Sequence, residues 1–402
     1  MKKTEKPHPP APSPIERGGI RTNNSPSQRE RALGGEVSLD DLIQKIAHLQ
    51  DTANRKYFPE GIFESYRSNN TWHYRRPDTN VFFTAITVFT LNNIKEFLSP
   101  ESQLLVENIT KKAVESYHLF KNKDGLNTYN FFQTNPSQHF PHGNILHRFN
   151  HFKIPDDIDD TAMIYMTLPH TKEEAKWLQD KLITHSNNYR QQIKNTFPEY
   201  KKLNAYSTWF GKDMYIEFDA CALSNMIYCQ LFFDLELDEH GQDSIKYIQQ
   251  VILSNQYIEQ PFRVAHQYAR TPLIMYHVMR LMNKFHVPEL EICREKLEKD
   301  ILHYLQNEDL SFWDRILLEI VARSPLTPRG GTFDSYISSV KVPPLGAGGA
   351  TFFIAGLLTA YENPLLYKLS SSKLFHINWT CEAHSLALLV EWIVATNRNN
   401  LE

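Results

Sequence analysis

The sequence lacks the features typical of membrane-spanning, secreted or nucleic-acid-binding proteins. No run approaches the ~18 consecutive apolar residues of a membrane-spanning helix, and the longest candidates, residues 350–361 and 386–395, are short. The four cysteines form no CxxC pair and no dense framework, which indicates free thiols in a reducing compartment. The net charge of −3 argues against a general nucleic-acid binder. The N-terminus has no apolar signal region, so we expect a cytoplasmic protein without a membrane span.

The first 37 residues differ in composition from the rest of the chain. They contain six prolines, four glycines and no aromatic residue, and such a segment cannot bury enough apolar surface to fold. We therefore predict a disordered tail at residues 1–37 and a single domain at residues 38–402. A helix is predicted to begin at Ser38, because a serine followed by acidic residues and the apolar pair Leu42 and Ile43 is typical of a capped helix.

Two kinds of apolar pattern alternate along the domain. Segments that are apolar on all sides predict buried helices, and segments with one charged face predict the helices that cover them. The first kind begins near Asp78, Asp156, Asp219, Thr271, Trp313, Gly349 and Glu382. The second kind spans residues 101–120, 172–195, 241–253 and 288–306. The alternation predicts an all-α fold, an α/α toroid of about six hairpins in inner and outer rings, with an open α-solenoid as the alternative. Strand signals are weak, and residues 340–342 are the one short extended candidate.

Residues 156–162 read DDIDDTA and place four carboxyl groups within five positions. Pro155 precedes them, and because proline is favoured in the first turn of a helix, the acids mark a helix start. Carboxyl groups this close repel one another, which raises the pKa of one member of a pair and leaves a proton for donation. The helix N-terminus acts in the opposite direction, because it favours the anion. In the structural alternative, Asp156 or Asp157 simply caps the helix, which accounts for one of the four acids.

The segment from Asp157 to Ala162 resembles the DxDDTA signature of class II terpene cyclases, which include squalene–hopene cyclases and copalyl diphosphate synthases. The resemblance implies an α/α toroid and proton-initiated cyclisation of an isoprenoid substrate. It assigns the proton donor to Asp159, with Asp157 and Asp160 as supporting acids. No redox cofactor is implied, and Mg²⁺ is implied only where the substrate carries a diphosphate. Family members usually join two toroids, whereas this chain has room for one, and it shows no convincing QW repeats.

The sequence is rich in aromatic residues, with 24 Phe, 19 Tyr and 6 Trp. Core packing is the favoured explanation of such a content, and an aromatic-lined cavity is the alternative. In a cyclase the rings would stabilise carbocations by cation–π interaction. The candidates for the cavity wall are Phe82, Phe83, Trp209, Phe210, Tyr215, Phe352 and Phe353.

Two metal-dependent alternatives remain. Asp156, Asp157 and Asp160 match DDxxD, the magnesium–diphosphate motif of class I terpene synthases. Pro155 argues against that reading, because the class I motif lies well along a helix. Asp219-Ala220-Cys221, with His277 or His384, resembles the zinc ligands of protein prenyltransferase β subunits, although a small buried Cys221 is the simpler interpretation.

Four further interpretations stay open. His139, His142, His147 and His151 lie upstream of the aspartates in what we predict to be a surface loop. The glycines at 346–349 precede a predicted helix, where a flexible loop is favoured over a phosphate cradle. The whole chain could also be a non-catalytic toroid that serves as a binding scaffold. A glycoside-processing barrel would need opposed carboxylates, for which Glu217 and Asp219 are the second candidates.

Overall fold

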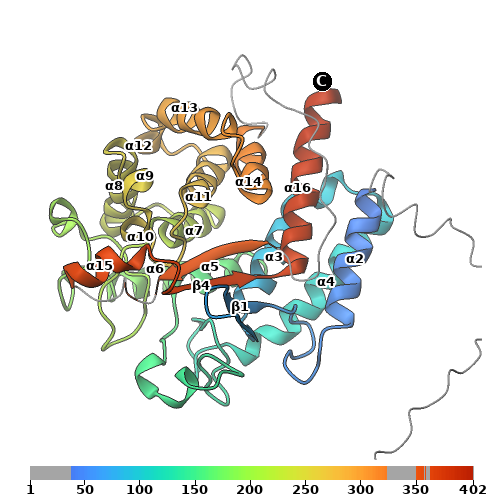
Figure 1. Ribbon diagram of the computed structural model, residues 1–402, viewed down its shortest axis with the longest axis horizontal. Coiled ribbons are helices and arrows are strands. Elements are labelled where there is room, and N and C mark those ends of the chain that lie inside the picture. Colours follow the sequence, from blue (N-terminus) through green and yellow to red (C-terminus); the bar gives the residue numbers. More distant parts are fainter. Residues whose placement is uncertain (1–37, 324–349, 357, 359–362, 402) are drawn as a thin grey trace, which may run out of the picture. The chain divides into compact units, whose positions relative to one another are not determined.

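A computed structural model describes residues 38–323, 350–356, 358 and 363–401 (Figure 1). The predicted tail at 1–37, the extended piece at 340–342 and the glycines at 346–349 lie outside the described residues. Ser38–Glu402 form one compact unit. The described part is mostly helical, as predicted, but it also contains a small antiparallel sheet that the all-α prediction missed. None of the described helices combines the length and apolar character needed to cross a membrane.

Six buried helices contact one another in sequence order. They are α3 (Phe82–Ile94), α5 (Ile158–Tyr165), α7 (Ala220–Phe232), α11 (Thr271–Lys284), α14 (Phe312–Ala322) and α16 (Glu382–Leu401). Each packs against the next, and α16 packs against α3, so the contacts close into a cycle. The sequence explains why these helices lie inside: α3 and α7, for example, contain no charged residue, and a helix that is apolar all round gains by complete burial.

Amphipathic helices cover this cycle. They include α2 (Leu39–Asp51), α4 (Pro100–Ser116), α8 (Glu239–Leu253) and α13 (Arg294–Leu305). Of these, α2 packs against α16 and α4, α4 against α3, α8 against α7, and α13 against α11 and α14. The Ser38 hydroxyl accepts the Asp41 N–H over 3.1 Å, which confirms the predicted cap of the first helix.

Two predicted covering helices are shorter than expected. The segment predicted at 172–195 is helical only as α6 (Lys172–Ile183), and the segment at 288–306 divides into α12 (Pro288–Glu291) and α13. After α6, the Asn187 side chain donates to the carbonyls of Lys201 and Leu203 and accepts the Ile193 N–H. A polar side chain that bonds to distant backbone in this way stabilises a loop in competition with a longer helix.

The remaining helices are short. They are α9 (Gln256–Glu259), α10 (Pro261–Val264), α15 (Pro364–Ser370) and the 3₁₀ turns Lys95–Phe97, Tyr117–Leu119, Leu146–Arg148, Asn150–Phe152 and Pro198–Tyr200.

The sheet joins two distant parts of the chain. Its strands are β1 (Tyr66–Asn69), β2 (Tyr74–Pro77), β3 (Thr351–Gly356) and β4 (His376–Thr380), in the antiparallel order β2-β1-β4-β3. The helix predicted to start near Gly349 is therefore wrong, because residues 351–356 form β3. A short apolar run does not by itself distinguish a strand from a buried helix, and here the alternating β4 supplies the partner that makes it a strand.

A buried ion pair fastens the sheet to the start of α3. Arg67 of β1 pairs with Asp78, which also accepts the indole N–H of Trp379 over 2.8 Å. Asn80 donates to the same carboxylate over 2.9 Å and accepts the Phe83 N–H. The helix predicted from Asp78 therefore begins only at Phe82, because Asp78 is engaged with β1 and β4.

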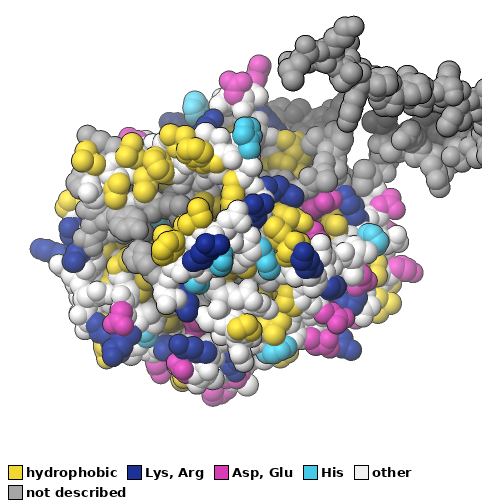
Figure 2. Space-filling model, turned by 60° about the horizontal axis from the view of Figure 1, so that its bottom comes forward, with side chains coloured by type: hydrophobic (Ala, Val, Ile, Leu, Met, Phe, Trp, Pro, Cys, Tyr) yellow, Lys and Arg dark blue, Asp and Glu magenta, His cyan; other side chains and the backbone are white. Residues whose placement is uncertain are grey.

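On the face that Figure 2 shows, side chains of both charge signs are interspersed with small groups of hydrophobic residues. That face therefore presents no extended patch of side chains with a single sign of charge.

Candidate active site

The aspartate segment at the start of α5 is held between two loops. The Asp157 N–H donates to the Tyr129 carbonyl over 3.1 Å, and the Ile158 N–H donates to the Thr208 carbonyl over 2.9 Å. The Thr161 hydroxyl donates to the Asp157 carbonyl over 2.6 Å and accepts the Tyr129 N–H over 3.0 Å. These bonds fix the position at which α5 begins, and with it the direction of the acidic side chains.

Asp156 faces away from its neighbours. Its Oδ2 accepts hydrogen bonds from Asn122 Nδ2 and Thr128 Oγ1, each over 2.6 Å. Asp156 therefore tethers the segment to the preceding loop, and it is absent from the lining of the cavity described below.

Asp157 is the N-cap of α5. Its Oδ1 accepts the backbone N–H groups of Asp159 and Asp160 over 3.0 and 2.8 Å. The capping alternative thus holds for Asp157, and the favourable interaction with the helix terminus is concentrated on this residue. Capping does not explain the carboxyl groups at Asp159 and Asp160.

Asp159 lies beside two hydrogen-bond donors from other inner elements. Asn225 Nδ2 of α7 donates to Asp159 Oδ1 over 2.6 Å, and the hydroxyl of Tyr268, in the loop before α11, donates to Oδ2. The residue is only 7% exposed. Burial raises the pKa of Asp159 above its ordinary value, although the hydrogen bonds from Tyr268 and Asn225 and the charge of Arg280 oppose the rise.

Asp160 is the most strongly perturbed acid of the segment. Burial raises the pKa of Asp160 well above its ordinary value, and the adjacent Asp157 carboxyl raises it further. Burial also raises the pKa of Asp157, while the hydrogen bond from Asp160 lowers it. Burial and the neighbouring Asp157 therefore both favour the protonated form of Asp160. Burial outweighs the effect of the helix terminus, which the sequence alone could not decide.

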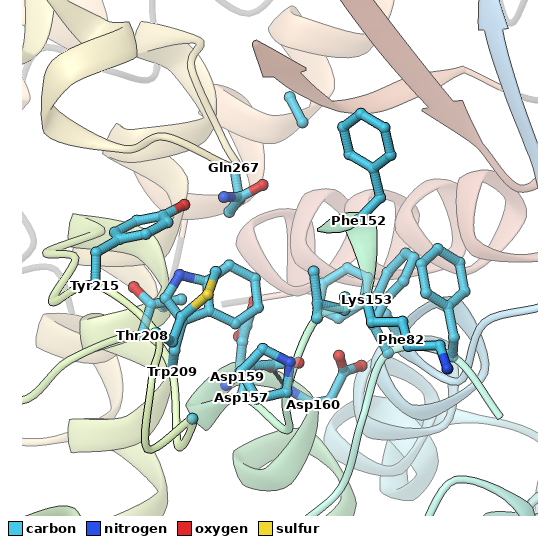
Figure 3. A pocket seen from close by; sticks show the side chains of 18 of the residues that line it. Phe82, Phe152, Lys153, Asp157, Asp159, Asp160, Thr208, Trp209, Tyr215 and Gln267 are labelled. Carbon is cyan, nitrogen blue, oxygen red and sulfur yellow. Dashed lines mark hydrogen bonds between the residues drawn. The ribbon is translucent and has the colours of Figure 1, made fainter. Parts of the chain in front are cut away.

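The three acids Asp157, Asp159 and Asp160 form part of the wall of a cavity of about 740 Å³ (Figure 3). This volume suits a small organic ligand. Figure 3 shows the acids side by side, with Trp209 and Tyr215 on one side and Phe82 on the other. The other aromatic lining residues are Phe131, Phe132, Phe140, Phe152, Tyr268, Phe353 and Trp379. Two exposed lysines, Lys153 and Lys212, also line the cavity.

The structure brings four of the seven predicted aromatic residues to this wall. Phe82, Trp209, Tyr215 and Phe353 line the cavity, whereas Phe83, Phe210 and Phe352 are absent from the lining. Phe83 stacks on Phe353 with a centroid distance of 5.5 Å, and Phe352 lies 4.5 Å from the His384 ring. Phe210 lies 5.5 Å from the His185 ring. Phe83 and Phe352 therefore support the wall from behind.

Several lining residues were not predicted from the sequence. Tyr268, Gln267, Phe131 and Trp379 come from loops and from β4. Tyr268 lies 109 positions from Asp159, with which it bonds. No local spacing links such positions, so only the fold could reveal them.

A second pair of acids lies close to the cavity but outside its lining. Asp219 caps α7, accepting the N–H groups of Cys221 and Ala222 over 2.9 and 3.1 Å. Glu217 accepts from Gln267 Nε2 over 3.4 Å and from the Tyr215 hydroxyl over 3.3 Å. Burial raises the pKa of Glu217 to about 8 and that of Asp219 to about 7. Since neither side chain lines the cavity, the pair does not oppose the first three acids across it.

The metal-site alternatives gain no support from the geometry. Within the described ranges, no group of three His, Cys, Asp or Glu side chains is arranged to hold a metal ion. Burial raises the pKa of the Cys221 thiol well above its ordinary value, which disfavours the thiolate form in which cysteine binds zinc. In the upstream loop, His139 bonds to the Phe149 carbonyl and His142 to the Thr79 hydroxyl. We therefore assign no residues to Mg²⁺ or zinc.

Compared with known protein families, with curated proteins and with solved structures, the chain matches none. The resemblance to class II terpene cyclases therefore rests on the DxDDTA motif.

Proposed function

We propose that this protein resembles class II terpene cyclases in function and catalyses the proton-initiated cyclisation of a polyprenoid. The observation that carries the proposal is the set of three buried carboxyl groups in the wall of a cavity to which ten aromatic residues also contribute. Burial raises the pKa of each of the three above its ordinary value, which favours the protonated form that a proton donor requires.

In the proposed reaction, Asp159 transfers its proton to a terminal carbon–carbon double bond. The π electrons form the new C–H bond and leave a tertiary carbocation. Internal double bonds then attack the cation in turn and form the ring C–C bonds. A final proton passes from the cyclic cation to water, a double bond forms, and Asp159 regains a proton from solvent. The reaction is an isomerisation and uses no oxidant or reductant.

The lining has the two properties that this chemistry requires. Aromatic faces such as those of Phe82, Trp209 and Phe353 stabilise a passing positive charge and exclude the water that would quench it. Lys153 and Lys212 offer positive charge at the same cavity. This combination favours a prenyl diphosphate over an uncharged hydrocarbon, because a diphosphate gains charge-assisted hydrogen bonds from lysines.

We further propose that the fold is an α/α toroid. Support comes from the closed cycle of contacts among α3, α5, α7, α11, α14 and α16, and from the amphipathic helices that cover them. In this arrangement the N-terminal ends of α5 and α7 border the cavity through Asp157 and Ala222.

The test is incubation of the purified protein with farnesyl diphosphate, geranylgeranyl diphosphate and squalene. Products are identified by gas chromatography with mass spectrometry after phosphatase treatment. We expect a cyclic product from a prenyl diphosphate and a loss of at least about a hundredfold in Asp159→Asn, the size typical of removing a general acid.

Asp156→Asn is the matched control. It removes one acid from the same segment, but the amide oxygen can still accept from Asn122 and Thr128, and residue 156 does not line the cavity. We expect it to retain the product. Equal loss in the two variants, or no product from the unmodified chain with any substrate, would contradict the cyclase proposal and favour a binding scaffold.

A further inference from the structure

A chain of hydrogen bonds leads from Asp159 into the cycle of inner helices. Asn225 of α7 donates Nδ2 to Asp159 Oδ1 over 2.6 Å, and Arg280 of α11 donates Nη2 to Asn225 Oδ1. The guanidinium lies 5.1 Å from the ring centroids of both Phe89 and Tyr276. Asn225 is only 1% exposed, so water does not compete for its amide.

The chemistry of these groups fixes the direction of each bond. A guanidinium has donors and no acceptor, so Arg280 must face the oxygen of the Asn225 amide. The amide nitrogen is then left to face Asp159, and it can only donate. Asp159 Oδ1 is therefore held as an acceptor. Any proton on Asp159 is therefore confined to Oδ2, because the partner of that oxygen, the Tyr268 hydroxyl, can accept a hydrogen bond as well as donate one.

We infer that Arg280 and Asn225 are positioning residues for Asp159, which fix its transferable proton on Oδ2 and stabilise the carboxylate that remains after the proton has left. The inference rests on the proposed function, in which Asp159 is the acid. Donors that are already oriented toward a developing charge act without reorganisation during the reaction. Arg280 and Asn225 thus select the oxygen of Asp159 that carries the proton, and they also make Asp159 a stronger acid.

The charged surroundings of Asp159 agree with this role. On its own helix it faces Asp157 and Asp160, and from α7 it faces Asp219 and Cys221, groups that carry negative charge or none. Helix α3, which packs against α5, contains no titratable side chain. Among the groups that act on Asp159, Arg280 supplies the positive charge.

The inference is tested by titrating Asp159 in the full-length chain without substrate. The carbonyl stretch of the protonated carboxyl is followed by infrared difference spectroscopy and assigned with Asp159→Asn. We expect Asn225→Leu and Arg280→Met each to raise the pKa of Asp159 by roughly one unit, a tenfold weaker acid. Arg280→Lys keeps the charge and a donor, and should restore most of the acid strength. The pH profile of product formation should move with the titration.

Asn283 supplies the matched control. It is also a buried amide that accepts from an arginine, Arg294, over 3.2 Å, but it donates to the Val321 carbonyl over 2.9 Å. Asn283→Leu should lower stability as Asn225→Leu does and leave the Asp159 titration unchanged.

An unchanged or lowered pKa of Asp159 in Asn225→Leu and Arg280→Met would overturn the inference. Should Asn225→Leu not fold, Asn225→Ala takes its place, because it removes the same N–H donor without adding a second ionisable group, and an unchanged titration there is equally decisive. Since the titration needs no substrate, it separates the two proposals. A chain that makes no cyclic product but shows the expected shifts refutes the cyclase function alone.

Discussion

The variant Glu217→Gln tests whether burial beside the cavity keeps a carboxyl group protonated. Glu217 is fully buried, and burial raises its pKa from the ordinary 4.5 to about 8. The folded chain therefore holds this proton at neutral pH, whereas the unfolded chain releases it above pH 4.5. A raised carboxyl pKa costs nothing at low pH, and it lowers stability progressively as the pH rises from 4.5 to 8.

The size of the effect follows from the shift. Each unit of pKa difference corresponds to about 1.4 kcal/mol, so the penalty is about 3 kcal/mol at pH 7 and about 1 kcal/mol at pH 5. Glu217→Gln removes the ionisation and hence the penalty. Relative to the unmodified chain, the variant should gain about 2 kcal/mol more in free energy of unfolding at pH 7 than at pH 5. Any cost of the new amide contacts is the same at both pH values and cancels.

The assay is urea denaturation of both proteins at the two pH values. Glu236→Gln, at an exposed position, is the control and should show no such difference. If Glu217→Gln changes stability by the same amount at pH 5 and pH 7, burial does not hold this carboxyl in its neutral form. The same physical cause would then be in doubt for Asp159 and Asp160, and the acid mechanism would lose its basis.

Three further outcomes are expected. Trp379→Phe removes the indole N–H that donates to the buried Asp78 carboxylate. The free energy of unfolding, measured by urea denaturation, should fall by about 1–3 kcal/mol. An unchanged value would show that this hydrogen bond does not contribute to stability. Phe82→Leu keeps the cavity wall apolar but removes an aromatic face from it. The amount of cyclic product, measured by mass spectrometry, should fall about three- to thirty-fold. Full activity would exclude a cation–π role for Phe82. In the unmodified chain, product formation should decrease about tenfold per pH unit above the raised pKa of Asp159, because the protonated form is lost; a rate that increases with pH would contradict an acid at this position.

The inner helices could be predicted because their signals are local. Apolar residues on all sides and an acidic cap, as at Asp219 before α7, lie within one short segment of sequence. The covering helices were harder to delimit. The loop after α6 depends on Asn187 and its bonds to residues as far as position 203, which no helical period reveals.

The sheet could not be predicted, because its strands pair across most of the chain. Tyr66 of β1 lies opposite Thr380 of β4, and a strand of four or five residues carries little signal without its partner. The misassigned helix near Gly349 has the same origin.

The site residues show the same difference between local signals, which the sequence reveals, and distant contacts, which it does not. The acids of α5 were visible because four carboxyl groups in five residues conflict with simple capping. Tyr268 and Asn225 were not, because they reach Asp159 across 109 and 66 positions. Helical geometry likewise decides that Phe82 lines the cavity while its neighbour Phe83 packs behind it, since adjacent residues point in different directions from the helix axis.

The pairing of β1 with β4 has a consequence for how the protein is made. Trp379 and Phe353, which complete the cavity wall, leave the ribosome long after Asp159, by roughly 10–45 s at ordinary rates of translation. Throughout that interval α3 lacks its last neighbour, α16, and exposes part of its apolar surface. The nascent chain is therefore a natural client for chaperones, and the wall of the acidic cavity is complete only when β3 and β4 have joined the sheet.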